Sequence, residues 1–181
     1  MGGEVFFTTE RLTVRAMLPS DVEAFVAYRS DPDVARYQSW SDYTRGQGAA
    51  LVAEMQDLRP GTPGEWYQLA VADADGRLVG DLATHVAADE HRQLEVGFTL
   101  APEHQGRGYA TEALRGLLGH AFGTWGIHRV VAITDARNEA AASLLLRVGF
   151  RQEAHFVDNV FFKGAWGSEL LFAMLESEWA G

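Results

Sequence analysis

The sequence LEVGFTLAPEHQGRGYATEA, which spans Leu94 to Ala113, predicts a strand, a tight turn and the start of a helix in direct succession. In its first part, apolar residues alternate with Glu95, Gly97 and Thr99, as in a strand with one buried face. Pro102 ends this strand, because proline has no N–H group for a sheet ladder. A strand that leads through a turn into a helix is therefore the unit around which the fold can be assembled.

The turn between the strand and the helix is rich in glycine. It reads Gln105-Gly106-Arg107-Gly108-Tyr109-Ala110, and the apolar spacing of a helix begins directly after it. Backbone N–H groups gather at the N-terminus of a helix, and glycines leave them accessible to phosphate oxygens. The residues themselves therefore predict a turn that binds pyrophosphate.

Outside this unit, periodicity and turn residues divide the chain into further strands and helices. Strands are expected at residues 10–16, 66–72, 77–86, 129–134, 151–162 and 168–176. Helices are expected after Pro19, over residues 46–58, from the turn to about Thr124, and between Asn138 and Gly149. Residues 34–44 show no clear period, so a loop or a short helix is expected there. The order β-α-α-β-β-β-α-β-α-β-β predicts a mixed sheet with helices packed on it.

The composition indicates one domain, residues 1–181, that is large enough to bury its own core. The absence of cysteine excludes disulfides, zinc–thiolate sites and cysteine nucleophiles. Neither a membrane span nor a signal peptide is apparent, so a cytoplasmic protein without a membrane partner is expected. The formal charge of −10 argues against binding to bare nucleic acid. It fits a cationic partner, although many proteins are acidic only for solubility.

Two patterns in the sequence resemble the GCN5-related N-acetyltransferase (GNAT) superfamily. The first is Gln105-x-x-Gly108-x-Ala110, placed between a strand and a helix as in the acyl-CoA signature of that family. The second is Asn138, followed eleven residues later by Gly149-Phe150. The expected order of elements also matches the family along nearly the whole chain. The resemblance implies an α/β (α+β) GNAT fold, with a mixed, mostly antiparallel sheet of six to seven strands flanked by about four helices.

Three further stretches resemble the RimJ/RimL-type branch of this superfamily. They are TERLTVRAMLPSDVEAF near the N-terminus, RYQSW at residues 36–40, and FFKGAWGSELLFAML at residues 161–175. Members of that branch acetylate protein N-termini, and their relatives acylate small amines or antibiotics. The resemblance therefore implies an N-acetyltransferase that uses acetyl-CoA and accepts a protein N-terminus or a small-molecule amine, and a homodimer is a possible assembly.

The resemblance also implies roles for individual residues in holding the cofactor. The backbone of the turn would bind the pyrophosphate of CoA, with Arg107 either adding charge or remaining solvated. The strand would pair with the pantetheine arm of CoA as if with an added strand. Asn138 would contact the same arm, or would only cap the helix that follows it. The residues implied for the cofactor are Phe98, Thr99, Leu100, Gln105, Gly106, Arg107, Gly108, Tyr109, Ala110 and Asn138.

Acetyl transfer requires a neutral amine, and an amine of the lysine type has a pKa of about 10.4. Glu95 is the expected catalytic residue, as a base acting directly or through water, because it follows the family context E-x-G-[FY]. Its alternative role is only to attract the amine or to pair with an arginine. A backbone N–H of the same strand is expected to stabilise the oxyanion.

The proton for the departing thiolate has no clear source in the sequence. Many family members carry a tyrosine where this chain has Leu145, and RimJ/RimL relatives often carry a serine where it has Ala141. Ser143 lies two residues further on, about 200° around a helix. Either Ser143 reaches the site through a shifted register, or the thiolate leaves without a protein acid.

Tyr37 and Trp40 belong to the segment that covers the substrate in related enzymes, and they would line the acceptor pocket or plug the core beneath a loop. No metal is expected, because the histidines lack the spacing of a metal site. They are His85, His91, His104, His120, His128 and His155. Two other functions remain open: a CoA-binding sensor or partner module without catalysis, and the transfer of a longer acyl group such as succinyl.

Overall fold

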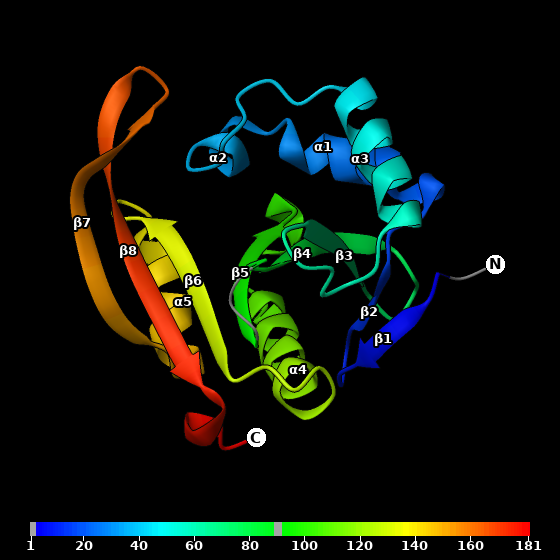
Figure 1. The fold of residues 1–181 in the computed structure, drawn as a ribbon. Coiled ribbons are helices and arrows are strands. Elements are labelled where there is room, and N and C mark those ends of the chain that lie inside the picture. Colours follow the sequence, from blue (N-terminus) through cyan, green and yellow to red (C-terminus); the bar gives the residue numbers. More distant parts are fainter. Residues whose placement is uncertain (1–2, 89–91) are drawn as a thin grey trace.

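The computed structural model describes residues 3–88 and 92–181, and its central feature is an eight-stranded sheet (Figure 1). The strands follow the order β1-β2-β3-β4-β5-β6-β8-β7, and β5 and β6 are parallel while the other described neighbours are antiparallel. The strands are β1 (Val5–Thr8), β2 (Thr13–Ala16), β3 (Trp66–Ala72), β4 (Leu78–Val86), β5 (Gln93–Leu100), β6 (Arg129–Asp135), β7 (Arg151–Phe162) and β8 (Ala165–Leu175). This mixed, mostly antiparallel sheet confirms the expected fold class.

The helices of the described chain are α1 (Val22–Arg29), α2 (Pro32–Ala35), α3 (Arg45–Asp57), α4 (Tyr109–Gly123) and α5 (Glu139–Val148). Short 3₁₀ turns lie at Pro19–Asp21, Pro102–His104 and Glu176–Glu178. None of the helices in the described ranges is long and apolar enough to cross a membrane.

The counts of strands and helices both exceed the expectation by one. The sheet has eight strands instead of six to seven, because the four residues of β1 pair with β2 at the edge of the sheet. A strand of four residues is too short to show an alternation of apolar and polar residues in the sequence. The additional helix is α2, which begins after Asp31 and has Pro32 in its first turn. The side chain of Asp31 accepts hydrogen bonds from the backbone N–H groups of Asp33 at 2.8 Å and Val34 at 3.3 Å.

The strands β5 and β6 separate soon after they begin. Their pairing covers only Gln93 to Glu95 on β5 and Arg129 to Val131 on β6. The pairing of β5 with β4 continues in regular register to Leu100. The second half of β5 therefore has a paired edge toward β4 and an edge toward β6 that the sheet does not use. This unused edge is the one with which the resemblance implied that the pantetheine arm would pair.

Both helices around this divergence begin and end where the sequence predicts. The N-cap of α4 is Gly108, whose φ of 80° is left-handed. The Oδ1 atom of Asn138 accepts a hydrogen bond from the N–H of Ala141 at 3.1 Å and so caps α5. Gly149 ends α5 with a φ of 115°, in the left-handed conformation that is common after a helix.

The core lies on both faces of the part of the sheet formed by β2 to β5. Leu69 and Val71 belong to the larger apolar cluster, which also contains the buried leucines of α4, such as Leu117. Ala70, between them on β3, belongs to a smaller cluster with Phe25 of α1. Alternate residues of a strand point to opposite faces, so α4 and α1 cover opposite sides of this half of the sheet.

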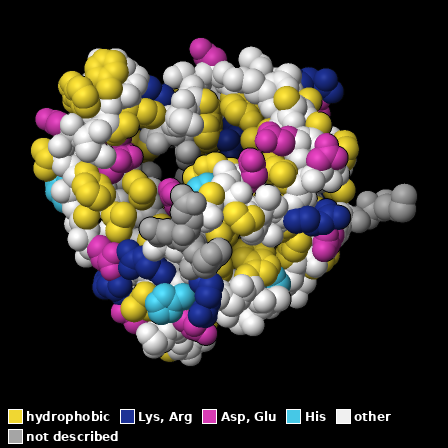
Figure 2. All heavy atoms as spheres, viewed as in Figure 1, with side chains coloured by type: hydrophobic (Ala, Val, Ile, Leu, Met, Phe, Trp, Pro, Cys, Tyr) yellow, Lys and Arg dark blue, Asp and Glu magenta, His cyan; other side chains and the backbone are white. Residues whose placement is uncertain are grey.

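The strands β7 and β8 form a long hairpin that extends beyond the sheet and curves toward α2 (Figure 1). Its turn lies at Lys163-Gly164, as expected, with φ values of 49° and 82°. The Nζ atom of Lys163 donates a hydrogen bond to the carbonyl oxygen of Ala35, the last residue of α2, at 2.5 Å. Figure 2 shows that the molecular surface is hollowed between this hairpin and the rest of the protein.

Candidate active site

Two connected cavities meet at the divergence of β5 and β6. The first, of about 800 Å³, extends from the glycine turn across the start of α4 to α5, and we call it the turn cavity. The second, of about 510 Å³, lies between the β7–β8 hairpin, the middle of the sheet and the segment after α2, and we call it the inner cavity. The residues that line both are Tyr37, Gln38, Phe98, Thr99, Asn138 and Ala141.

The glycine turn presents free backbone N–H groups to the turn cavity. Gly106 and Gly108 have φ values of 72° and 80°, which residues with a side chain rarely adopt. In the described part of the chain, the N–H groups of Gly106, Arg107 and Gly108 donate to no protein acceptor. The side chain of Gln105 donates to the carbonyl oxygen of Leu100 at 3.1 Å and so joins the turn to the end of β5. This arrangement suits an anion such as a phosphate.

Nine of the ten residues implied for the cofactor line the turn cavity. They are Phe98, Thr99, Leu100, Gln105, Gly106, Gly108, Tyr109, Ala110 and Asn138. The exception is Arg107, whose side chain is exposed and does not line the cavity. An exposed side chain at this position agrees with either expected role, added charge or solvation.

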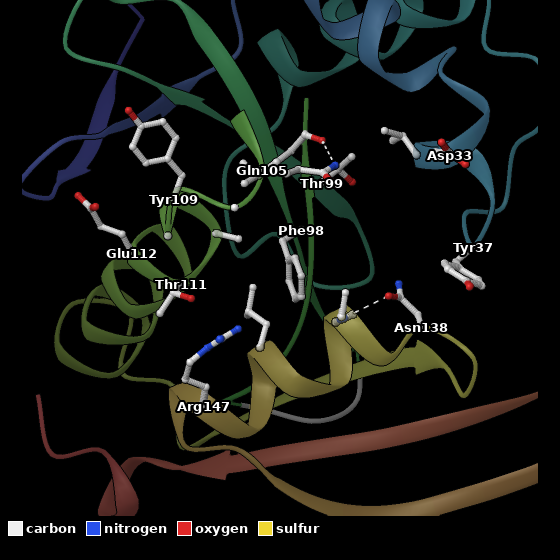
Figure 3. Close-up of a pocket in the computed structure, with 18 of the residues that line it drawn as sticks. Asp33, Tyr37, Phe98, Thr99, Gln105, Tyr109, Thr111, Glu112, Asn138 and Arg147 are labelled. Carbon is white, nitrogen blue, oxygen red and sulfur yellow. Dashed lines mark hydrogen bonds between the residues drawn. The ribbon is translucent and has the colours of Figure 1, made fainter. Parts of the chain in front are cut away.

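The two walls of the turn cavity face each other across Phe98 (Figure 3). Tyr109 and Glu112 come from the first turns of α4, while Asn138 and Arg147 come from α5. The Oδ1 atom of Asn138 is already used to cap α5, which leaves its Nδ2 group for another partner. The two roles that the sequence left open for Asn138 are therefore compatible.

Glu95 lines the inner cavity from β5 and is half-buried. Burial raises the pKa of Glu95, the opposed charge of His85 lowers it, and Glu169 of β8 raises it again, with a net increase. His85 is the direct neighbour of Glu95 across the β4–β5 ladder, and its ring stacks on Trp66 with 5.0 Å between centroids. A carboxylate with a raised pKa is a stronger base, so this environment suits proton abstraction.

A buried polar cluster that the sequence did not reveal lies at the end of the inner cavity. Asp81 of β4 is 1% exposed and accepts hydrogen bonds from Tyr28 and Gln68. It also forms an ion pair with Arg29, whose Nη2 atom lies 2.9 Å from Oδ1. Burial and the adjacent Asp81 both raise the pKa of Tyr28, so its hydroxyl stays protonated and donates. The only signal in the sequence was a charged residue at the end of α1 and another within β4.

Both residues expected at the acceptor, Tyr37 and Trp40, line the inner cavity. The Nε1 atom of Trp40 donates to the carbonyl oxygen of Arg29 at 2.9 Å, and its ring lies 4.2 Å from the Arg29 guanidinium carbon. Trp40 is therefore held by the buried cluster. Tyr37 lies at the junction of the two cavities, with the guanidinium carbon of Arg137 5.9 Å from its ring centroid.

Acidic side chains outnumber basic ones around the inner cavity. Four carboxylates line it, against the single guanidinium of Arg29. The four are Asp81, Glu95, Asp135 and Glu169. Asp81 pairs with Arg29, and Asp135 pairs with Arg137 at 2.7 Å. Within residues 3–88 and 92–181, Glu95 and Glu169 take part in no ion pair, so the cavity attracts cations.

The helix α5 offers no hydroxyl to the inner cavity. Ala141 and Leu145 line it, whereas Ser143 is exposed and lines neither cavity. The helix is regular between its two caps, so no shift of register turns Ser143 inward. As for a metal, the described residues hold no group of three potential ligands, and His91 lies outside them.

Taken together, a sheet that opens at one strand, an amide-lined turn beside the opening and an acidic second cavity define an acyl-CoA-dependent transferase. A family model described as acetyltransferase (GNAT) domain matches residues 11–151. The chain therefore belongs to the GNAT acetyltransferase family, and it is an acyl-CoA-dependent N-acetyltransferase.

Proteins from several bacteria are similar to this chain over most of its length. The uncharacterized N-acetyltransferase p20 of Bacillus licheniformis is 28% identical over 96% of this chain and 97% of its own. The ribosomal protein uS5-alanine N-acetyltransferase of Escherichia coli is 25% identical over 97% and 93%. A spermidine N(1)-acetyltransferase of Vibrio cholerae is 28% identical over 62% and 65%. A GNAT-family acetyltransferase structure from Bacillus anthracis superposes with a TM-score of 0.86, at 26% identity, over 94% of this chain and 98% of the other.

Proposed function

We propose that this protein transfers the acetyl group of acetyl-CoA to a primary amine by direct attack within a ternary complex. The observation that carries this proposal is the free half of β5, which leads directly into an amide-lined turn and also presents Glu95 to the inner cavity. One strand thus borders both the turn cavity, with room for a nucleotide, and a separate cavity for an acceptor. Direct transfer requires both substrates to be adjacent, and the two cavities share the wall at Phe98 and Thr99.

The residues of the turn cavity fit CoA. The free N–H groups of Gly106, Arg107 and Gly108 would hold the pyrophosphate, with the N-terminus of α4 behind them. The unpaired edge from Phe98 to Leu100 would bind the amides of the pantetheine arm as an added strand. The Nδ2 group of Asn138 would donate to the same arm from the opposite wall.

Glu95 would act as the base that removes a proton from the acceptor. An ammonium group with a pKa of about 10.4 is almost entirely protonated near neutral pH, so it cannot attack until a base takes its proton. Glu95 faces the inner cavity and has a raised pKa, which suits this task. A backbone N–H of the free edge of β5 would stabilise the oxyanion of the tetrahedral intermediate. Since Ala141 and Leu145 carry no acid, the thiolate would leave without a proton from these two positions of α5.

The acidic inner cavity favours an acceptor that arrives as a cation. The unpaired carboxylates of Glu95 and Glu169 would attract an ammonium group, and the aromatic rings of Tyr37, Trp40 and Trp66 would interact with it through their faces. Two of the relatives differ in their acceptor, since one is named for spermidine and the other for a ribosomal protein. The cavity is compatible with either an amine-bearing small molecule or a protein N-terminus.

A thiol-release assay tests the proposal. Purified protein is incubated with acetyl-CoA or succinyl-CoA and with polyamines, aminoglycosides or N-terminal peptides, and free CoA is measured. We expect release that depends on both acetyl-CoA and one class of amine, and mass spectrometry should show one added acetyl group. Faster release from succinyl-CoA would assign a longer acyl donor instead. Binding of CoA without release from any donor and amine would contradict transfer and favour a sensor role.

A further inference from the structure

The N-terminal segment Thr9-Glu10-Arg11-Leu12 contacts the first turn of α4, far away in sequence, through three hydrogen bonds to a single carboxylate. The hydroxyl of Thr9 donates to Oε1 of Glu112 at 2.6 Å. The backbone N–H of Arg11 donates to the same oxygen at 2.8 Å, and its Nε atom donates to Oε2 at 2.6 Å. We call Thr9, Arg11 and Glu112 the turn clamp.

The carboxylate of the turn clamp is largely buried and ionised. The side chain of Glu112 is 16% exposed. Burial alone would raise its pKa, but the hydrogen bonds from Thr9 and Arg11 outweigh burial and lower the pKa of Glu112. Its charge neutralises that of Arg11, so the clamp as a whole adds little net charge to the turn cavity.

Arg11 also reaches the pyrophosphate turn itself. Its Nη1 atom donates to the carbonyl oxygen of Arg107 at 3.0 Å, and its guanidinium carbon lies 4.7 Å from the centroid of the Tyr109 ring. The carbonyl of Arg107 and the N–H of Gly108 belong to one trans peptide and point in opposite directions. A carbonyl held by Arg11 therefore fixes the N–H of Gly108 on the side away from Arg11, where no described protein group accepts it.

We propose that the turn clamp positions the pyrophosphate turn, with Arg11 orienting the Arg107–Gly108 peptide so that its N–H is directed at a phosphate of the cofactor. This inference rests on the proposed function. Arg11 is here a positioning residue, since three of its five N–H donors hold Glu112 and the carbonyl of Arg107. Gly108 belongs to the same arrangement, because its left-handed φ of 80° is one that residues with a side chain rarely adopt, and a Cβ atom there would contact Nη2 of Arg11 at 3.4 Å. The first turns of α4 direct Tyr109 and Glu112 to the same side, away from α5 (Figure 3).

The inference is tested by comparing acetyl-CoA with S-acetylpantetheine, which has the same thioester and no phosphate. In Arg11→Ala we expect the KM for acetyl-CoA to rise about tenfold, since the peptide N–H is no longer oriented toward a charged acceptor. The kcat at saturation and the kcat/KM for S-acetylpantetheine should stay at the wild-type value. Arg11→Lys should keep a raised KM, because a single nitrogen cannot reproduce the planar fork in which separate nitrogens of Arg11 reach Glu112 and the carbonyl of Arg107.

The control is Arg45→Ala, which removes an arginine–carboxylate pair of similar length, 2.6 Å to Glu23, on the surface and outside both cavities. It should change neither KM. An equal fall in kcat/KM for acetyl-CoA and for S-acetylpantetheine in Arg11→Ala would show a general loss of structure and overturn the inference. Full recovery in Arg11→Lys would show that charge matters rather than orientation, and would also overturn it.

Failure of the proposed function can be distinguished from failure of the clamp. If the wild-type protein transfers no acetyl group, calorimetric binding of CoA and of pantetheine replaces the rate measurement. Weaker binding of CoA in Arg11→Ala, with unchanged binding of pantetheine, would support the turn clamp without catalysis. Equal binding of CoA by the wild type and by Arg11→Ala would refute it.

Discussion

The two cavities that meet at β5 are built in different ways. The turn cavity is lined largely by one continuous stretch, from Phe98 to Glu112, with α5 as its opposite wall. The inner cavity is lined by side chains from elements far apart in the sequence, including Arg29 of α1, Asp81 of β4 and Glu169 of β8. The first kind of site needs only glycines at the start of a helix, whereas the second needs the whole fold to bring its residues together.

This difference corresponds to the two substrates of the proposed reaction, the acyl donor and the acceptor. Backbone N–H groups recognise a phosphate in the same way whatever side chains surround them, so the turn cavity suits a constant cofactor. Side chains from separate elements can change one at a time, so we expect the inner cavity to be the place where acceptors are distinguished. Residues of the turn should therefore affect the KM for the donor, and residues of the inner cavity should affect the acceptor, proton transfer or stability.

The largest effect is expected at Glu95, the proposed base in the inner cavity. Glu95→Gln keeps the shape of the side chain but removes the base, so kcat/KM for the amine should fall roughly 10²- to 10³-fold at neutral pH. Binding of acetyl-CoA, measured by calorimetry, should not change, because Glu95 does not line the turn cavity. Glu54→Gln on the exposed face of α3 is the matched control. Wild-type rates in Glu95→Gln across the pH range would remove Glu95 from the mechanism.

The extent to which the sequence predicted the site follows the same division. The strand, the turn and the helix from Leu94 onward were readable, because alternation, Pro102 and the glycines are local signals. The N-cap at Asn138 was readable for the same reason. The strand β1 was missed because four residues carry too little periodicity, and its place is decided by pairing with β2.

The parts of the site that were missed depend on long-range contacts. The cluster of Arg29 and Asp81 joins residues 52 positions apart, and the bond of Arg11 to Glu112 spans 101. No local pattern contains both partners. Tyr37 and Trp40 were assigned to the acceptor only through the resemblance, since their segment has no period of its own, and the structure places both at the inner cavity.

The second-largest effect is expected in stability, at the buried cluster below the inner cavity. Asp81→Ala leaves the guanidinium of Arg29, which is 5% exposed, without its carboxylate. Removal of one partner of a buried ion pair typically lowers the free energy of unfolding by about 3 kcal/mol or more. Urea unfolding followed by circular dichroism measures the loss.

Asp75→Ala is the matched comparison for Asp81→Ala. Asp75 also pairs with an arginine, Arg77, at 3.4 Å, but both side chains are exposed. Such a pair contributes at most about 1 kcal/mol, so unfolding should change little. Equal stability of the two variants would show that the buried cluster is not what holds α1 against β4.

A smaller effect, on the donor alone, is expected from Gly108→Ala. An added Cβ is strained at a φ of 80°, so the turn should shift from its place beside Arg11 and the KM for acetyl-CoA should rise roughly fivefold. Gly76 has the same φ of 80° in the β3–β4 hairpin, where an added Cβ meets nothing within 4 Å. Gly76→Ala should therefore lose similar stability without any change in KM. If Gly76→Ala raised the KM for acetyl-CoA as much as Gly108→Ala does, the effect would come from strain in the whole fold and not from the turn.

The smallest effect is expected from Glu169→Gln, and it concerns pH. Besides burial, which raises the pKa of Glu95, and His85, which lowers it, the negative charge of Glu169 raises it. Removing that charge makes the ionised form of Glu95 easier to reach, so the pKa of Glu95 should fall. The base acts only when ionised, and activity is lost as the pH falls through its pKa. The acid limb of kcat/KM should therefore move to lower pH in Glu169→Gln, by less than about one unit.

Glutamine can still accept the hydrogen bond that Asn159 donates to Glu169 at 2.6 Å, so the hairpin should keep its shape. The same variant should bind a cationic acceptor a few-fold more weakly, because one of the two unpaired carboxylates of the inner cavity is gone. Glu23→Gln on the surface of α1 serves as the control for both measurements. A shift of the acid limb of kcat/KM to higher pH would contradict this prediction. It would mean that Glu169 favours the ionised form of Glu95 through a bound cation instead of disfavouring it by repulsion.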